Sequence, residues 1–245
     1  MGLIQVQDVR GLISLNQPDR NLLSKFLMDC AGAGQDQLSS LMDTLEDYQE
    51  PGKLKRLNGA KDFEYSSAGM KPPSGAALLS EREIWRVFGW ESLRAKWEEN
   101  SCFDDVSIYN GGSLNLNTAT PKAMQAYGAP KETVDNVMQG RSTGDYSQVN
   151  ALAAAQGGSG FMGIQAARIP SPILRVTQSL PHAAWSLRYD LRLRTNTEGI
   201  PWTISNLRRI PSVFESISDR KLKWPIVKPI SEKDKNAITQ PILPF

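Results

Sequence analysis

The sequence predicts an α+β protein in which an antiparallel sheet is interrupted by a large inserted α-helical domain. Three observations predict this class: a strand-like run at residues 3–16, a mostly helical block of about 150 residues, and alternating runs after residue 171. If the first run joins the later strands in one sheet, the block between them is an insertion. The predicted division is a first strand within 1–20, the helical domain at 21–168, the remaining strands at 169–212 and an extended C-terminal tail at 213–245.

An early motif, GLISLN at residues 11–16, returns as GSLNLN at residues 112–117. Each copy alternates apolar and polar residues and is followed within a few positions by a proline, Pro18 or Pro121. An Asn can cap a helix N-terminus, and proline suits the first helical turn. Each copy therefore predicts a short strand that leads into a helix, and a structural role is favoured over a ligand site.

Helical spacing of apolar residues follows the first motif at 21–28 and 37–45. Residues 49–73 lack periodicity and predict a long loop, which is the first place to expect a site. Ser80 and Glu83 have the spacing of a capping box, which predicts a third helix with a buried stripe. That stripe consists of Ile84, Val87 and Phe88.

Residues 121–127 and 133–138 form two further short helical patterns, separated by a break at 128–130. This outline is typical of a helix-hairpin-helix, so a nucleic-acid-binding protein is the alternative function. The nucleic-acid-binding form usually offers two close glycines and free backbone N–H groups to a phosphate. Here Gly128 is the only glycine of the break, and Pro130 has no N–H, so a packing role is favoured.

Three runs of period-two alternation follow, at 173–180, 184–194 and 202–207. They predict an antiparallel meander. In the middle run Leu and Tyr side chains alternate with charged ones, and we expect the charged side to be the solvated face. The apolar side consists of Leu187, Tyr189, Leu191 and Leu193, and the charged side consists of Arg188, Asp190, Arg192 and Arg194.

Composition excludes several classes of protein. The 28 basic and 26 acidic residues nearly cancel, so bulk binding of nucleic acid is not predicted. The chain has no apolar run of the ~18 residues that a membrane span needs. A single histidine, His182, lies in a turn-like segment, and the common nucleotide-binding and hydrolase motifs are missing, so we expect no enzyme and no catalytic residues.

The chain has two cysteines, Cys30 and Cys102. They are too far apart in sequence for a C-x-x-C metal or redox motif. One disulfide or two buried thiols remain open.

Several motifs, taken in order over roughly residues 3–210, make the chain resemble the K-type minor pseudopilins of the bacterial type II secretion system. Each motif is short, but their joint order is fairly specific. They are DVRGLISLN at 8–16, LMDTLED at 41–47, RLNGA at 56–60, Tyr65, LSEREI at 79–84, VFG at 87–89 and LNLNTA at 114–119.

This resemblance implies a periplasmic, non-enzymatic assembly protein with a pseudopilin-type sheet interrupted by a large α-domain. It would lie at the tip of the pseudopilus beside the I- and J-type minor pseudopilins, in contact with other secretion-system subunits, and support protein export across the outer membrane. Family members carry an N-terminal membrane helix that prepilin peptidase processes. This chain lacks that helix, so we interpret Met1 as the start of a truncated soluble piece, anchored to the inner membrane only in the longer protein. A periplasmic location would permit a disulfide between Cys30 and Cys102.

The resemblance also implies calcium binding in the α-domain. Carboxylates flank the long loop, and Ca²⁺ prefers six to eight oxygen ligands. The chain departs from the family pattern at Lys61, where a lysine replaces a carboxylate, removes a ligand and adds an opposing charge. The alternative is a solvated acidic loop. The candidate calcium ligands are Asp43, Asp47, Asp62 and Glu64.

Overall fold

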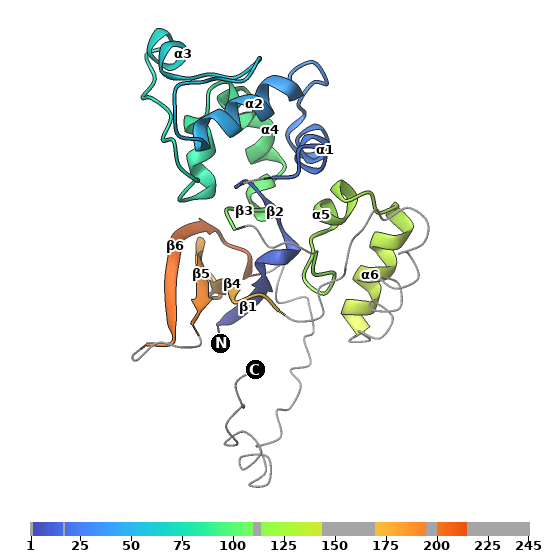
Figure 1. The fold of residues 1–245 in the computed structure, drawn as a ribbon. Coiled ribbons are helices and arrows are strands. Elements are labelled where there is room, and N and C mark those ends of the chain that lie inside the picture. Colours follow the sequence, from blue (N-terminus) through green and yellow to red (C-terminus); the bar gives the residue numbers. More distant parts are fainter. Residues whose placement is uncertain (1, 17, 110–113, 144–169, 195–199, 215–245) are drawn as a thin grey trace, which may run out of the picture.

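The protein combines a four-stranded sheet with helices that lie at one end of it and beside it (Figure 1). The computed structural model describes residues 2–16, 18–109, 114–143, 170–194 and 200–214. The strand order is β1-β4-β5-β6, and each neighbouring pair is antiparallel. The four strands are β1 (Leu3–Asp8), β4 (Ile173–Ser179), β5 (Trp185–Leu193) and β6 (Trp202–Pro211).

The first strand pairs with a strand from the far end of the chain. β1 and β4 align Asp8 opposite Leu174, and the helical block lies between them in sequence. Because the block is inserted between two adjacent strands of one sheet, the structure confirms the α+β class with an interrupted antiparallel sheet. The end of the predicted helical domain at residue 168 and residues 215–245 of the predicted tail lie outside the described residues.

The two echoed motifs do not both form strands. The predicted strand 3–16 is broken by a 3-10 helix, η1 (Val9–Gly11), and its second half is the short strand β2 (Ile13–Ser14). β2 pairs in parallel with β3 (Val106–Ser107) rather than with the second copy. The described part of that copy forms a turn instead, because the N–H groups of Thr118 and Ala119 both donate to the carbonyl of Asn115.

The first two predicted helices are present as α1 (Arg20–Ala31) and α2 (Leu38–Gln49). The predicted N-caps differ, however. The side chain of Asp19, not the Asn of the motif, accepts a hydrogen bond from the N–H of Leu22. Thr120 caps α5 (Pro121–Ala126) in the same way, and Pro121 does occupy the first turn.

The segment after Ser80 is a 3-10 helix, η2 (Glu81–Arg86), rather than an α-helix opened by a capping box. The Ser80 hydroxyl makes no cap, because the N–H of Glu83 donates to the Ser80 carbonyl instead, at 3.1 Å. The Glu83 carboxylate accepts a hydrogen bond from the hydroxyl of Tyr48 at 2.8 Å. The apolar stripe is nevertheless buried as predicted at Ile84 and Val87, whereas its third member, Phe88, is only partly buried. The remaining elements are α3 (Asp62–Ser67), which lies within the predicted loop, η3 (Trp90–Leu93), α4 (Arg94–Glu99), η4 (Cys102–Asp104) and α6 (Lys131–Thr143).

Two hydrophobic cores hold the helices together. The larger core lies among α1, α2, η3 and α4, and Trp97 packs against Phe26 and Trp90 with ring centroids 5.9 and 6.3 Å apart. A smaller core lies under α5 and α6 around Leu116 and Val137. The helical block therefore has its own apolar interior, independent of the sheet.

Candidate functional sites

The sheet buries Arg188 and Asp190 of its charged face and leaves its apolar face partly exposed, so the predicted orientation was wrong for these two residues. Arg192 and Arg194 are exposed, as predicted. Ser186, Arg188 and Asp190 of β5 are buried, whereas the alternating Leu187 and Tyr189 are only half-buried. The physical reason is that polar groups of the helical block lie against the charged face and pair with it.

A buried ion-pair network joins this charged face to the helical block. Arg175 of β4 and Glu81 of η2 are 2% and 1% exposed, and their side chains form an ion pair at 2.5 Å. The Nε of Arg175 also lies 3.4 Å from Oδ1 of Asp190. Arg188 pairs with Asp104 and donates to Thr177 at 3.1 Å. The buried charges are therefore compensated across the boundary between sheet and insertion.

A bulge in β6 completes the network. The β5–β6 register shifts between Arg188 and Asp190, and Asn206 opposite has a φ of 53°, a conformation that Asn tolerates better than most residues. The Asn206 amide donates to both Asp190 and Glu81, at 2.9 and 2.5 Å. Arg208 reaches Glu81 at 3.1 Å, and burial lowers its pKa to about 10.

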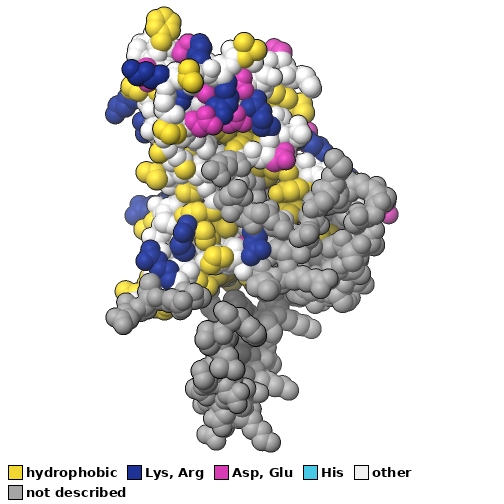
Figure 2. Space-filling model, viewed as in Figure 1, with side chains coloured by type: hydrophobic (Ala, Val, Ile, Leu, Met, Phe, Trp, Pro, Cys, Tyr) yellow, Lys and Arg dark blue, Asp and Glu magenta, His cyan; other side chains and the backbone are white. Residues whose placement is uncertain are grey.

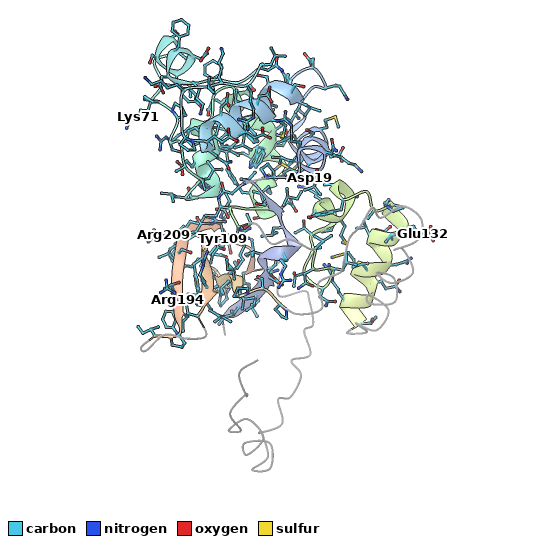
Figure 3. All side chains as sticks on the ribbon, viewed as in Figure 1. Asp19, Lys71, Tyr109, Glu132, Arg194 and Arg209 are labelled. Atoms are coloured by element: carbon cyan, nitrogen blue, oxygen red, sulfur yellow. A yellow bond between two sulfur atoms is a disulfide. The ribbon has the colours of Figure 1, made fainter. Side chains whose placement is uncertain are left out.

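The opposite face of the sheet carries large hydrophobic side chains, and we call it the apolar face. The guanidinium of Arg209 lies 4.6 Å from the centre of the Trp185 ring. Figure 3 places Arg209 and Arg194 at opposite ends of the β5–β6 pair. Over the sheet in Figure 2, hydrophobic and basic side chains lie next to each other. Large exposed hydrophobic side chains on neighbouring strands, such as Leu193 opposite Trp202, are typical of interaction sites in soluble proteins. The exposed residues of the apolar face are Ile4, Val6, Trp185, Leu193, Trp202, Ile204 and Leu207.

Asp8 connects the end of β1, where the chain leaves the sheet, to the segment before β4, where the chain returns to it. Its buried carboxylate accepts hydrogen bonds from the hydroxyl and the N–H of Ser171, at 2.5 and 2.9 Å, and from the amide of Asn115 at 2.8 Å. Burial alone would raise the pKa of Asp8, but the bonds from Ser171, Arg10 and Asn115 together lower it. Ser171 lies 163 positions from Asp8, so this cluster closes the insertion.

The two echoed motifs meet at this point. The N–H of Asn115 donates to the carbonyl of Arg10 at 3.1 Å, and the N–H of Thr120 donates to the carbonyl of Gly11 at 3.1 Å. A Cβ on Gly11 would lie 2.4 Å from the carbonyl oxygen of Thr118, so a side chain cannot be accommodated there without a shift of the backbone. The echo is therefore a structural contact, as the sequence favoured.

The four candidate calcium ligands do not converge on one point. Asp43 pairs with Arg20 at 2.7 Å, and Asp47 is fully buried and pairs with Arg56 at 2.9 Å. Glu64 accepts the N–H of Lys61 and pairs with Lys55, and these contacts lower its pKa to about 2. Asp62 is exposed.

The donor set of this loop does not fit a calcium ion in the described conformation. Ca²⁺ needs several free oxygens directed at one centre, whereas Asp43, Asp47 and Glu64 are each occupied by a cation of the chain itself. Within the described ranges, no group of three or more His, Cys, Asp or Glu side chains is placed to hold a metal ion. No step of the function is therefore assigned to calcium.

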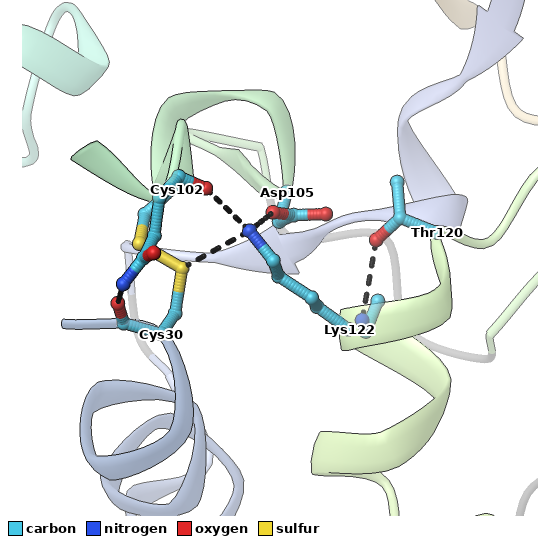
Figure 4. The surroundings of a disulfide bond; sticks show 7 residues. Cys30, Cys102, Asp105, Thr120 and Lys122 are labelled. Atoms are coloured by element: carbon cyan, nitrogen blue, oxygen red, sulfur yellow. Dashed lines mark hydrogen bonds and ion pairs between the residues drawn. A yellow bond between two sulfur atoms is a disulfide. The ribbon is translucent and has the colours of Figure 1, made fainter. Parts of the chain in front are cut away.

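The two cysteines form a disulfide that ties α1 to η4, with their Cα atoms 6.1 Å apart (Figure 4). Lys122 lies beside it: its ammonium is 3.5 Å from Sγ of Cys30 and 3.3 Å from the carboxylate of Asp105. Burial raises the pKa of Asp105. The bridge closes a loop with a sequence separation of 72. In the chain-entropy description a loop of that length corresponds to about 4 kcal/mol of stabilisation.

The helix pair α5–α6 uses its basic side chains internally. Lys131 pairs with Asp135 at 2.6 Å, and Lys122 pairs with Asp105. Arg141 donates to the carbonyls of Ala119 and Leu116. These cations are not directed at a common phosphate position, so the geometry does not favour the nucleic-acid alternative.

Sequence reasoning did not identify the ion-pair partners of Glu81 and of the carboxylates near the loop after α2. The pattern at 79–84 predicts only a helix start that contains Glu81, Arg56 enters only through the RLNGA motif, and nothing in the sequence points to Arg20. The only local signal was Lys61, whose charge is opposite to that of the carboxylate it replaces. The other partners lie far away in sequence, as with Glu81 and Arg175 at a separation of 94.

No protein-family model matches the chain, and no curated protein is significantly similar to it. Among solved structures it is similar to a chain of the GspK-GspI-GspJ complex from the type 2 secretion system of enterotoxigenic Escherichia coli. The TM-score is 0.55 at 11% sequence identity, over 86% of this chain and 80% of that chain. None of the helices in the described ranges has both the length and the apolar character that spanning a membrane requires. The chain therefore has an α+β, pseudopilin-like fold: an antiparallel sheet interrupted by a helical insertion.

Proposed function

We propose that this chain is a structural minor pseudopilin of the K type, which assembles with I- and J-type minor pseudopilins at the tip of a type II secretion pseudopilus. One observation carries the proposal. A large helical domain is inserted between the adjacent strands β1 and β4, and this whole arrangement resembles a chain of the GspK-GspI-GspJ complex. In that role the chain supports protein export and catalyses no reaction.

The apolar face supports a role in an assembly. Its side chains include Trp202 and Ile204, which are 44% and 48% exposed on the outer strand β6. Burial of such surface against another element is favourable by roughly 25 cal/mol per Å² of apolar area. An assembly protein can expose this face before it is incorporated, and cover it afterwards.

A periplasmic location fits the disulfide between Cys30 and Cys102, because disulfides persist in oxidising compartments. The single histidine, His182, lies exposed in the turn between β4 and β5. Its exposure fits the proposed structural, non-enzymatic role better than a catalytic one.

The test is co-purification of this chain with the soluble domains of the I- and J-type pseudopilins of its own system. Size-exclusion chromatography with light scattering should give one species with the summed mass of the three chains. Circular dichroism of the isolated chain serves as the folding control. If a folded chain elutes alone at every concentration tested, the proposed assembly role is wrong. A filter-binding assay with DNA should then be run, because retention that survives moderate salt would favour the nucleic-acid alternative.

A further inference from the structure

The segment between α2 and α3 is irregular, yet its backbone lies close against α2. A Cβ on Gly59 would lie 1.8 Å from Oδ2 of Asp47, so the loop passes directly over this fully buried carboxylate. The N–H of Arg56 donates to the same oxygen at 3.1 Å. A buried carboxylate under an irregular loop needs a compensating positive charge.

The guanidinium of Arg56 supplies that charge to three carboxylates of α2 and its C-cap. Its Nη1 lies 2.9 Å from Oδ1 of Asp47, and its Nε lies 2.6 Å from Glu46. Its Nη1 and Nη2 bond both carboxylate oxygens of Glu50, at 2.8 and 2.6 Å. One cation therefore bridges three carboxylates that would otherwise repel one another, and Arg20 pairs with Glu46 as well, at 2.7 Å.

The ammonium of Lys61 is a second internal cation, and it bonds to backbone oxygens. Lys61 is 6% exposed, and its Nζ donates to the carbonyls of Asp47 at 2.6 Å and Glu50 at 2.8 Å. These carbonyls lie at the C-terminal end of α2, where they have no intrahelical partner and where the helix dipole favours a cation. The Lys61 N–H meanwhile donates to Glu64 and starts α3.

We propose that Arg56 and Lys61 take the structural place of a bound divalent cation, so that the segment from the end of α2 to the start of α3 is held in shape without metal. Carbonyl and carboxylate oxygens are the ligands that a hard cation uses. Here the same kinds of oxygen, from Glu46, Asp47 and Glu50, are satisfied by N–H donors of the chain. These contacts are internal, so they hold whether or not the chain joins a pseudopilus.

The test compares Lys61→Met, which keeps the length of the side chain but removes its charge, with Lys53→Met, a matched change at an exposed lysine of the same loop. We expect Lys61→Met to lower the Tm by about 4 °C or more and Lys53→Met to leave it within about 1 °C of the unchanged chain. Limited proteolysis should cut residues 50–61 faster in Lys61→Met only. Equal effects of the two substitutions would overturn the proposal.

A second measurement tests metal binding by the unchanged chain, so its result does not depend on whether a variant folds. Its Tm should be the same with millimolar CaCl₂ and with EGTA, and terbium luminescence should report no binding. A rise in Tm of several degrees with CaCl₂, reversed by EGTA, would show that an ion and not the two side chains holds the loop.

Discussion

Single residues decide how the insertion is joined to the sheet. Asp8 ends β1, and its carboxylate bonds Asn115 in the turn before α5 and Ser171 at the entry to β4. Three segments distant in sequence therefore depend on one charge. Because hydrogen bonds to a buried charged group contribute about 1.5–3 kcal/mol each, this aspartate contributes more than an ordinary strand-end residue.

Substitution of Asp8 by Asn should lower the free energy of unfolding by about 1.5–3 kcal/mol at pH 7. The folded state lowers the pKa of Asp8, so its contribution is present above the ordinary carboxyl pKa of about 3.9 and is lost as the pH falls below it. The difference between the two proteins should therefore shrink between pH 5 and pH 3. Urea titrations at each pH measure the free energies of unfolding. The control is Asp36→Asn, a change at an exposed aspartate. A pH-independent difference would contradict this assignment.

At the scale of elements, the alternation of residues in β5 predicts a strand, but it does not determine which face of the strand is exposed to solvent. Arg188 and Asp190 are buried, and the Leu187 side is half-exposed. The bulge at Asn206 in β6 directs an amide into the charged face. Strands β4, β5 and β6 therefore each place an arginine on the inner face, at Arg175, Arg188 and Arg208, the reverse of the usual arrangement.

Polar substitutions on the apolar face should change the free energy of unfolding little but should reduce the exposed apolar surface. Ile204→Thr should cost less than about 1 kcal/mol, since Ile204 is already 48% exposed. Val176→Thr is the matched change at a position that is 6% exposed, and burial of its hydroxyl should cost about 1–3 kcal/mol. Urea unfolding measures both, and bis-ANS fluorescence should fall in Ile204→Thr. An equal loss of stability in the two variants would mean that the apolar face is covered.

Over the whole molecule, the sheet and the helical insertion are joined through buried charge. Glu81 of η2 contacts Arg175 of β4 and Arg208 of β6, so one acid of the insertion holds two strands. Such pairs add little over a well-packed apolar contact, but removal of one partner is costly. The relative position of the two parts therefore depends on this acid.

The substitution Glu81→Gln should lower the free energy of unfolding by about 3 kcal/mol, because Arg208 loses the acid it pairs with and Arg175 keeps only Asp190. The control is Glu91→Gln, which breaks an exposed pair with Arg94 and should cost less than about 1 kcal/mol. Thermal unfolding followed by circular dichroism measures both. Similar losses in the two variants would show that the network does not join sheet and insertion.

The sequence alone determined the type and order of α1, α2 and the strands of the sheet. Apolar spacing predicted α1, α2 and the strands of the meander, and the insertion followed from the position of the first strand. Proline chemistry predicted the first turn of α5, and the buried stripe at Ile84 and Val87 was also predicted correctly. These features depend on interactions between residues a few positions apart, which periodicity records.

Only the tertiary structure decided which face of the sheet is buried and which cations satisfy which acids. Alternation gives a period of two but does not say what lies against either side, and the partners of Arg175 and Asp8 come from positions 94 and 163 residues away. The same holds for the loop after α2. The pattern of carboxylates suggested a metal there, but Asp43, Asp47 and Glu64 each pair with a cation of the chain itself. Charge pairing acts through space, so a list of residues cannot determine it until the fold brings the groups together.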